Sequence, residues 1–233
     1  MQLFHRTLVV ANNSWVQRVK RRADPARVRT NLNAYLSETF SGKPYKLHAD
    51  YARHQEWMKQ RVAEAAIPIE DLASPLDCET LYLVARAAGI RRAVDTGVFY
   101  GALTGCLAAA IRDNGGGQLY SVDLPKPALH GWLVPSDPTV RWDLHVGDAK
   151  EILPRLLSKV APIDLFLHDS LHSLEHMFFE FREASRALRP RGILVSHDVV
   201  AVVPWLNGFQ RFCLSQRLPY RVFRNLGVAV AIG

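Results

Sequence analysis

The residues best suited to chemistry follow an apolar run in the second half of the chain. In FLHDSLHSLEH (166–176), His168 and Asp169 end the run, and His172 and His176 follow at four-residue spacing. An imidazole titrates near neutral pH and can take a proton from a reacting group. A carboxylate offers hard oxygen ligands to a divalent cation. This stretch therefore indicates proton transfer or metal binding where a buried strand ends.

Four other strand-like segments also run into an aspartate. These acids are Asp95, Asp123, Asp148 and Asp198. The apolar segments alternate with helical patterns, which predicts an α/β fold whose doubly wound, mostly parallel sheet is covered on both faces. Ligands of such sheets bind beyond the carboxyl ends of the strands. A single aspartate there is commonly a turn former or helix cap, but five acids at one edge predict a functional cleft.

The periodicity predicts six strands and four helices in residues 76–233. The predicted strands are 91–97, 118–125, 140–148, 163–169, 192–198 and 227–232. The predicted helices are 78–89, 104–114, 149–160 and 173–190, and Pro154 is expected to kink the third or end it early.

Residues 1–75 lack this alternation, and we expect them to form a helical cap. Their apolar residues are too few for a separate core, so the cap should pack over the cleft or build a homodimer. This segment carries 12 Lys/Arg against 7 Asp/Glu, whereas residues 76–233 carry 17 against 15. The basic stretch 19–29 is either a docking patch for an anionic partner or a solvated helix face.

Composition limits the classes of protein. A hydrophobic content of 48% supports a real core. Cys78, Cys106 and Cys213 lie far apart, which argues against a disulfide framework or a structural zinc site and favours a reducing cytoplasm. The sequence offers no apolar stretch long enough to span a membrane.

A glycine-containing turn joins the first strand to the next helix in VDTGVFYGALTG (94–105). Gly97 and Gly101 would allow a sharp turn and the close approach of a ligand, or simply a turn. The spacing is not the G-x-G-x-x-G of a dinucleotide cradle. Asp123 could accept hydrogen bonds from both ribose hydroxyls, and Asp148 could accept one from an adenine amino group. A glycine turn, an acid for the ribose and an acid for the adenine, in that order along the chain, predict a nucleoside site.

These motifs resemble the class I S-adenosylmethionine-dependent methyltransferases, in particular small-molecule O-methyltransferases similar to the catechol, caffeoyl-CoA and macrolide-sugar enzymes. DTGVFYGALT (95–104) stands where the family reads E-I-G-T-F-x-G-x-S-T, with Leu103 in place of the serine. The resemblance covers roughly residues 76–233 and implies a seven-stranded, Rossmann-like sheet. It implies that S-adenosylmethionine is bound by Asp95, Gly97, Phe99, Tyr100, Gly101, Thr104, Asp123, Leu124, Gly147, Asp148, Ala149, His168 and Asp169.

The resemblance also implies the chemistry. Methyl transfer from a sulfonium is an in-line displacement, so the enzyme must hold the acceptor oxygen and remove its proton. Asp169 and His172 occupy the catalytic positions of the family, and His172 could act as the base. A metal site for Mg²⁺ or Mn²⁺ would consist of Asp169, His197 and Asp198. Catalysis without a metal remains open, as do structural roles for His168, His176 and His197.

The acceptor is expected to be a small molecule, such as a natural-product intermediate, whose hydroxyl is methylated to release S-adenosylhomocysteine. Two loops could shape its pocket with Trp132, Leu133, Trp205, Leu206 and Phe209, or these residues could pack into the domain. A nucleic-acid methyltransferase docking through residues 18–29 is the second interpretation. A non-methylating protein that binds S-adenosylmethionine is the third.

Overall fold

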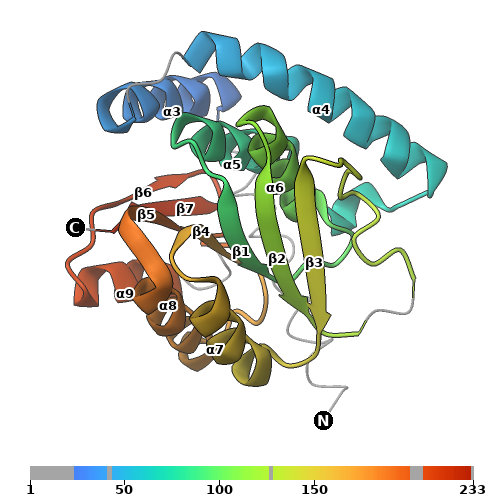
Figure 1. The fold of residues 1–233 in the computed structure, drawn as a ribbon. Coiled ribbons are helices and arrows are strands. Elements are labelled where there is room, and N and C mark those ends of the chain that lie inside the picture. Colours follow the sequence, from blue (N-terminus) through green and yellow to red (C-terminus); the bar gives the residue numbers. More distant parts are fainter. Residues whose placement is uncertain (1–23, 41–43, 126–127, 200–206, 232–233) are drawn as a thin grey trace.

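The computed structural model describes residues 24–40, 44–125, 128–199 and 207–231. Its strands are β1 (Arg92–Thr96), β2 (Gly117–Asp123), β3 (Val140–Val146), β4 (Ile163–His168), β5 (Leu188–Ser196), β6 (Tyr220–Phe223) and β7 (Leu226–Val230). In the described residues they form one sheet in the order β3-β2-β1-β4-β5-β7-β6 (Figure 1). Strands β1 to β5 pair in parallel, and β7 is antiparallel to both neighbours. The predicted doubly wound sheet is confirmed, and β6 is the strand that periodicity did not predict.

Helices cover both faces of the sheet. They are α3 (Pro25–Thr39), α4 (Pro44–Glu64), the 3₁₀ turn η1 (Ile69–Asp71), α5 (Pro75–Ala87), α6 (Ala102–Asp113), α7 (Ala149–Val160), α8 (Leu174–Ala187) and α9 (Gly208–Ser215). Side chains alternate along each strand, so Leu165 and Leu167 belong to the core beneath α5 and α6, while Phe166 packs with α7 to α9. Figure 1 shows α3 and α4 lying outside α5 and α6.

Two connections differ from the prediction. Helix α7 has the predicted bounds and does not end early at Pro154, because its apolar face, including Leu153 and Leu157, is buried against the sheet. That burial outweighs the hydrogen bond that the proline removes. Helix α9 occupies part of the connection that was expected to be a loop.

The helical cap shares its core with the sheet domain. Leu32, Leu36 and Tyr51 are buried in the same cluster as α5 and α6. On α5, Glu79 accepts hydrogen bonds from Arg29 (Nη2, 2.8 Å) and from His48 (Nδ1, 2.8 Å). Arg29 of the basic stretch therefore pairs within the molecule. Residues 19–23 of that stretch lie outside the described residues.

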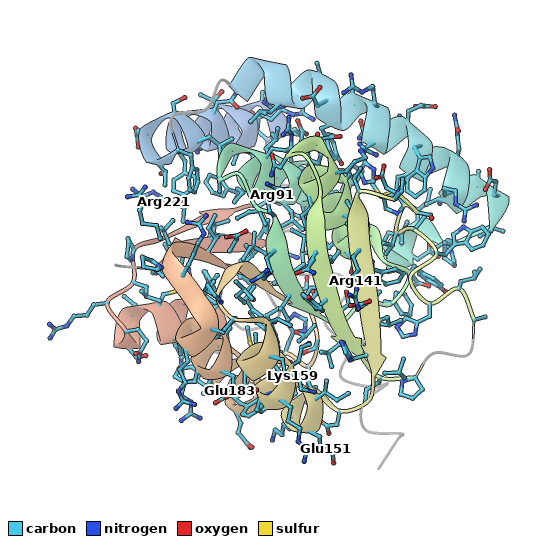
Figure 2. The ribbon with its side chains drawn as sticks, viewed as in Figure 1. Arg91, Arg141, Glu151, Lys159, Glu183 and Arg221 are labelled. Atoms are coloured by element: carbon cyan, nitrogen blue, oxygen red, sulfur yellow. The ribbon has the colours of Figure 1, made fainter. Side chains whose placement is uncertain are left out.

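The aromatic loop residues that are described pack into the domain. Leu133 and Phe209 are fully buried, and the Trp132 indole donates to the Arg61 carbonyl at 3.0 Å. Trp205 and Leu206 lie outside the described residues. Charged side chains such as Glu151, Lys159 and Arg221 lie on the outside of the molecule (Figure 2).

None of the helices in the described ranges combines the length and the apolar character that crossing a membrane requires.

Candidate active site

A cleft of about 830 Å³ opens at the carboxyl ends of β1 to β5. Its wall is completed by Glu70 to Ala73, which precede α5. Eleven of the residues proposed from the sequence line it: Gly97, Phe99, Asp123, Leu124, Gly147, Asp148, Ala149, Asp169, His172, His197 and Asp198. Asp95, Tyr100, Gly101, Thr104 and His168 are not in its lining. The sheet edge that the aspartates indicated is therefore the edge that carries the cleft.

Gly97 allows the loop after β1 to touch the loop after β4. Its φ is +83°, and a Cβ built there would lie 2.2 Å from the Asp169 carbonyl oxygen. Its N–H donates to the Val122 carbonyl at 2.9 Å, which ties the turn to β2 as well. Only glycine fits both the backbone conformation and the contact.

Gly97→Ala should lower the free energy of unfolding by about 3 kcal/mol or more, because positive φ and an overlap with main chain both oppose the new methyl group. Gly89→Ala is the matched control. Gly89 has φ +64° with nothing within 4 Å of a Cβ, so only the backbone cost of about 1–2 kcal/mol applies. Urea unfolding measures both variants, and equal losses would contradict the close approach at Gly97.

Asp123 is anchored by two loops at the edge of the cleft. Its carboxylate accepts hydrogen bonds from the Phe99 and Leu124 backbone N–H groups, each at 2.8 Å. His130 Nε2 lies 3.1 Å from Oδ2. The side chain is only 10% exposed, so its orientation toward the cleft is fixed. Sequence reasoning missed His130, which lies in a connection without periodicity.

Asp148 combines two roles that the sequence left as alternatives. It is the N-cap of α7, where its side chain accepts from the Lys150 N–H at 2.7 Å. It is also exposed and lines the cleft. A helix cap can therefore still present a carboxylate oxygen to a ligand.

Asp95 lies behind the cleft and joins β1 to its neighbours. It is buried and accepts hydrogen bonds from the hydroxyls of Thr104 on α6 and Ser121 on β2. Burial raises the pKa of Asp95 to about 7, although both hydrogen bonds favour the anion. Tyr100 and Gly101 form the turn into α6, where the Tyr100 carbonyl accepts from the Leu133 N–H. These residues support the cleft from outside its lining.

Asp169, His172 and Asp198 converge at the base of the β4 and β5 loops. One ligand atom from each lies within 4.8 Å of the others. His172 Nε2 is 3.9 Å from Asp169 Oδ1. Burial lowers the pKa of His172, and His168 nearby lowers it further. A neutral imidazole beside two carboxylates can accept a proton or bind a divalent ion.

His197 contacts carboxylates through both ring nitrogens. Its Nδ1 lies 2.9 Å from Asp169 Oδ1, and its Nε2 lies 3.5 Å from Asp77 Oδ2. Burial opposes its charge, but Asp169 and Asp198 raise the pKa of His197 well above the ordinary value. His197 thus contacts Asp169, and the three side chains whose ligand atoms lie within 4.8 Å of one another are Asp169, His172 and Asp198.

Asp77 and Glu180 are buried acids that sequence reasoning missed. Asp77, on α5, accepts from Ser74 at 2.7 Å and from Arg224. Glu180, on α8, accepts from Thr96 and His168 at 2.6 Å, and from Ser170 and His176 at 2.8 Å. Each had the pattern of a polar position on an amphipathic helix. His176 is therefore buried against Glu180, which agrees with a structural role for this residue.

Glu180 should make the free energy of unfolding fall at low pH. Burial opposes its charge, but hydrogen bonds from His168 and His176 lower the pKa of Glu180 to about 2 from 4.5. A lowered pKa contributes stability above pH 4.5 that is lost as the pH falls through about 2. From about pH 5 to about pH 2, the wild type should lose roughly 3 kcal/mol more than Glu180→Gln.

Denaturant unfolding at each pH measures this loss of stability. The exposed Glu151, changed to Gln, is the control and should keep the wild-type pH dependence. If the free energy of unfolding of Glu180→Gln changed with pH in parallel with the wild type, Glu180 would not be a buried anion whose pKa is lowered.

Comparison with known proteins agrees with this architecture. Residues 94–199 match the sequence model of a family described as a methyltransferase domain. An O-methyltransferase from Bacillus cereus in complex with S-adenosylhomocysteine (SAH) is 18% identical, with a TM-score of 0.58 over 86% of this chain and 97% of that chain. TomG from Streptomyces achromogenes, involved in tomaymycin synthesis and solved with S-adenosylmethionine, is 20% identical, with a TM-score of 0.57 over 91% and 100%.

The SAH-bound methyltransferase PaMTH1 of Podospora anserina is 17% identical, with a TM-score of 0.55 over 86% of this chain and 93% of that chain. At these identities the likeness is one of fold. No curated protein matches the sequence. The matched segment runs from β1 to the loop after β5, and so contains the strand ends that build the cleft. Residues 94–199 thus resemble a methyltransferase domain, and the likeness of the whole sheet to these methyltransferase structures is a likeness of fold.

Proposed function

We propose that this chain is a class I S-adenosylmethionine-dependent methyltransferase that acts on a hydroxyl group of a small molecule, with His172 as the base. The observation that carries this proposal is a histidine with a lowered pKa, next to Asp169, in the same cleft as Asp123. Asp123 would accept the ribose hydroxyls of S-adenosylmethionine, and Asp148 the adenine amino group. The names of TomG and the Bacillus cereus enzyme support a hydroxyl acceptor, and that of TomG a natural-product intermediate.

The reaction would proceed as one displacement. The acceptor oxygen attacks the methyl carbon, the carbon–sulfur bond breaks, and its electron pair stays on sulfur, which leaves neutral SAH. The hydroxyl proton passes to His172 and then to solvent. Asp169 would be held in place by protonated His197, which is itself held by Asp77. The reacting residues would thus be fixed by buried ionic contacts.

The residues also suit a divalent ion. Two carboxylate oxygens and one imidazole nitrogen, from Asp169, Asp198 and His172, form a donor set that Mn²⁺ or Mg²⁺ can accept. A bound ion would act as a Lewis acid that lowers the pKa of the acceptor hydroxyl. A His172 that ligates the ion cannot also be the base. Turnover after treatment with a chelator distinguishes the two roles.

Incubation of the full chain with methyl-labelled S-adenosylmethionine tests the function. Catechol, a methyl hexoside and tyramine are suitable hydroxyl probes, and bulk tRNA is the nucleic-acid probe. We expect SAH release that depends on a hydroxyl probe, together with a product carrying the label on oxygen. Label on tRNA alone would favour the nucleic-acid alternative. The pairing of Arg29 with Glu79 argues against that alternative.

We also propose that residues 1–75 are a structural cap on the domain at 76–233, that the chain forms a homodimer, and that it works in a reducing cytoplasm. The free, buried cysteines support the last point. Deleting residues 1–70 should leave a chain that aggregates, because it uncovers the core that Leu36 and Tyr51 fill. Circular dichroism and sedimentation measure this outcome. A folded, fully active truncation of unchanged oligomeric state would contradict the cap.

A further inference from the structure

Another cavity lies between α4, the last turn of α6 and the loop that precedes β3. Its volume is about 400 Å³, which is in the range of small-molecule sites. None of its lining residues belongs to the lining of the cleft. Helix α6 begins beside the cleft and has 12 residues, a length of about 18 Å, so the two cavities lie at opposite ends of it. The lining consists of Arg53, His54 and Trp57 of α4, Arg112 and Asp113 of α6, and residues 135–137 of the loop.

His54 is a buried residue in this lining whose ring lacks a hydrogen-bond partner. It is 2% exposed, and its Nε2 atom makes no hydrogen bond within the described part of the chain. The ring lies nearly parallel to those of Trp57 and Tyr82, with interplanar angles of 20° and 14°. Stacking fixes the plane of the ring but does not satisfy its nitrogen. Because buried polar atoms almost always have a partner, Nε2 points to a molecule bound in the cavity.

The basic groups around His54 have hydrogen-bond donors to spare. Burial lowers the pKa of His54 to about 4, so the ring is neutral at neutral pH and the positive charge comes from two arginines. A guanidinium has five N–H donors. In the described ranges, Arg112 uses one of them on Asp113 at 2.8 Å, and Arg53 uses one on Asp50 at 2.8 Å. Most of their donors therefore remain for a ligand.

The acids of the same lining are already engaged. Asp113, which accepts from Arg112 through Oδ1, accepts from the Tyr82 hydroxyl through Oδ2. Asp137 accepts from the backbone N–H and the hydroxyl of Thr139. The cavity therefore offers mainly N–H donors, which suit the oxygens of an anion.

We propose that this cavity is a second ligand site that binds a small aromatic carboxylate. The carboxylate accepts hydrogen bonds from the Arg112 guanidinium and from His54 Nε2, which carries the ring hydrogen. The aromatic part packs against Trp57 and Pro135, both of which are only partly buried. Arg53 is exposed and adds a second positive charge. Because the ligand contacts α4 of the cap as well as α6, its binding stabilises the attachment of the cap to the sheet domain.

Titration of the full chain with 1-naphthoate tests the site. Tryptophan indole N–H signals in ¹H–¹⁵N spectra are the readout, and the Trp57→Phe variant identifies the signal of Trp57. We expect this signal to shift with a Kd below about 1 mM. Inorganic phosphate lacks the ring and 1-naphthylmethanol lacks the charge, so each should bind at least about tenfold more weakly.

Two variants test which side chains bind the carboxylate. His54→Phe keeps an aromatic ring but removes Nε2, and Arg112→Gln removes a guanidinium. Each should raise the Kd for 1-naphthoate by about tenfold or more. The matched controls lie on β3, outside the lining of this cavity. His145→Phe removes another buried Nε2 that has no partner in the described residues, and Arg141→Gln removes another guanidinium that pairs with an aspartate. Both controls should bind 1-naphthoate like the wild type.

Three results would overturn the proposal. The first is an unchanged Trp57 signal with 1-naphthoate at about 10 mM. The second is phosphate or 1-naphthylmethanol binding as tightly as 1-naphthoate, which would exclude an aromatic carboxylate as the preferred ligand. The third is a wild-type Kd in Arg112→Gln or in a folded His54→Phe. None of these measurements involves methyl transfer, so their outcome does not depend on the proposed function.

Discussion

Asp123→Ala should weaken the binding of SAH by roughly 10²–10⁴-fold. The carboxylate is 10% exposed and held by the N–H groups of Phe99 and Leu124. A ribose that loses two charge-assisted acceptors loses about 1.5–3 kcal/mol for each. The change also releases the turn at Phe99, which lines the same cleft. Isothermal titration calorimetry with SAH measures the loss.

Asp143→Ala is the matched control for this prediction. Asp143 is on β3, next to β2 in the sheet, and its carboxylate pairs with Arg141 outside the cleft lining. SAH affinity should be unchanged in this variant. Asp123→Asn keeps one acceptor oxygen and should lie between Asp123→Ala and the wild type. Wild-type affinity in Asp123→Ala would contradict the ribose assignment.

His172→Ala should lower kcat by about 10²–10⁴-fold, the usual contribution of a positioned general base. SAH affinity should be unchanged, because Gly97, Asp123 and Gly147 lie on other strand ends. The measurement is steady-state turnover with catechol, combined with calorimetric titration of SAH.

His145→Ala is the control, since His145 is on β3 and is not among the cleft-lining residues. Its turnover should match the wild type. Equal turnover of His172→Ala and the wild type would remove His172 from the reaction. A loss of SAH binding in His172→Ala would make it a cofactor contact instead.

The fold could be predicted because its signals are local. Short apolar runs alternating with amphipathic stretches predict a parallel sheet whatever the distant contacts are. The same reasoning placed acids at one sheet edge, where the cleft lies. Strand β6 is four residues long and only partly buried, so it lacks a pattern strong enough to stand out. Helix α9 has only eight residues and follows Pro204 and Trp205, which interrupt the apolar pattern before it.

The spacing of the site residues in the sequence could not predict which of them line the cleft and which are buried behind it. His168 and Asp169 are neighbours, yet one is buried against Glu180 and the other lines the cleft. The face of the sheet that a side chain occupies depends on the pleat of the strand. It also depends on contacts with residues that are distant in the sequence. The same applies to His197, whose charge depends on Asp77 at the start of α5 and on Asp169 after β4. Only the assembled structure brings these groups together.

The most direct test is calorimetric titration of the chelator-treated full-length protein with SAH, repeated with Mg²⁺ and with Mn²⁺. The cleft beside Asp123 and Asp169 predicts one site with micromolar affinity. A change in affinity or enthalpy with Mn²⁺ would support an ion held by Asp169, His172 and Asp198. Absence of SAH binding under all three conditions would contradict the assignment of this cleft to S-adenosylmethionine.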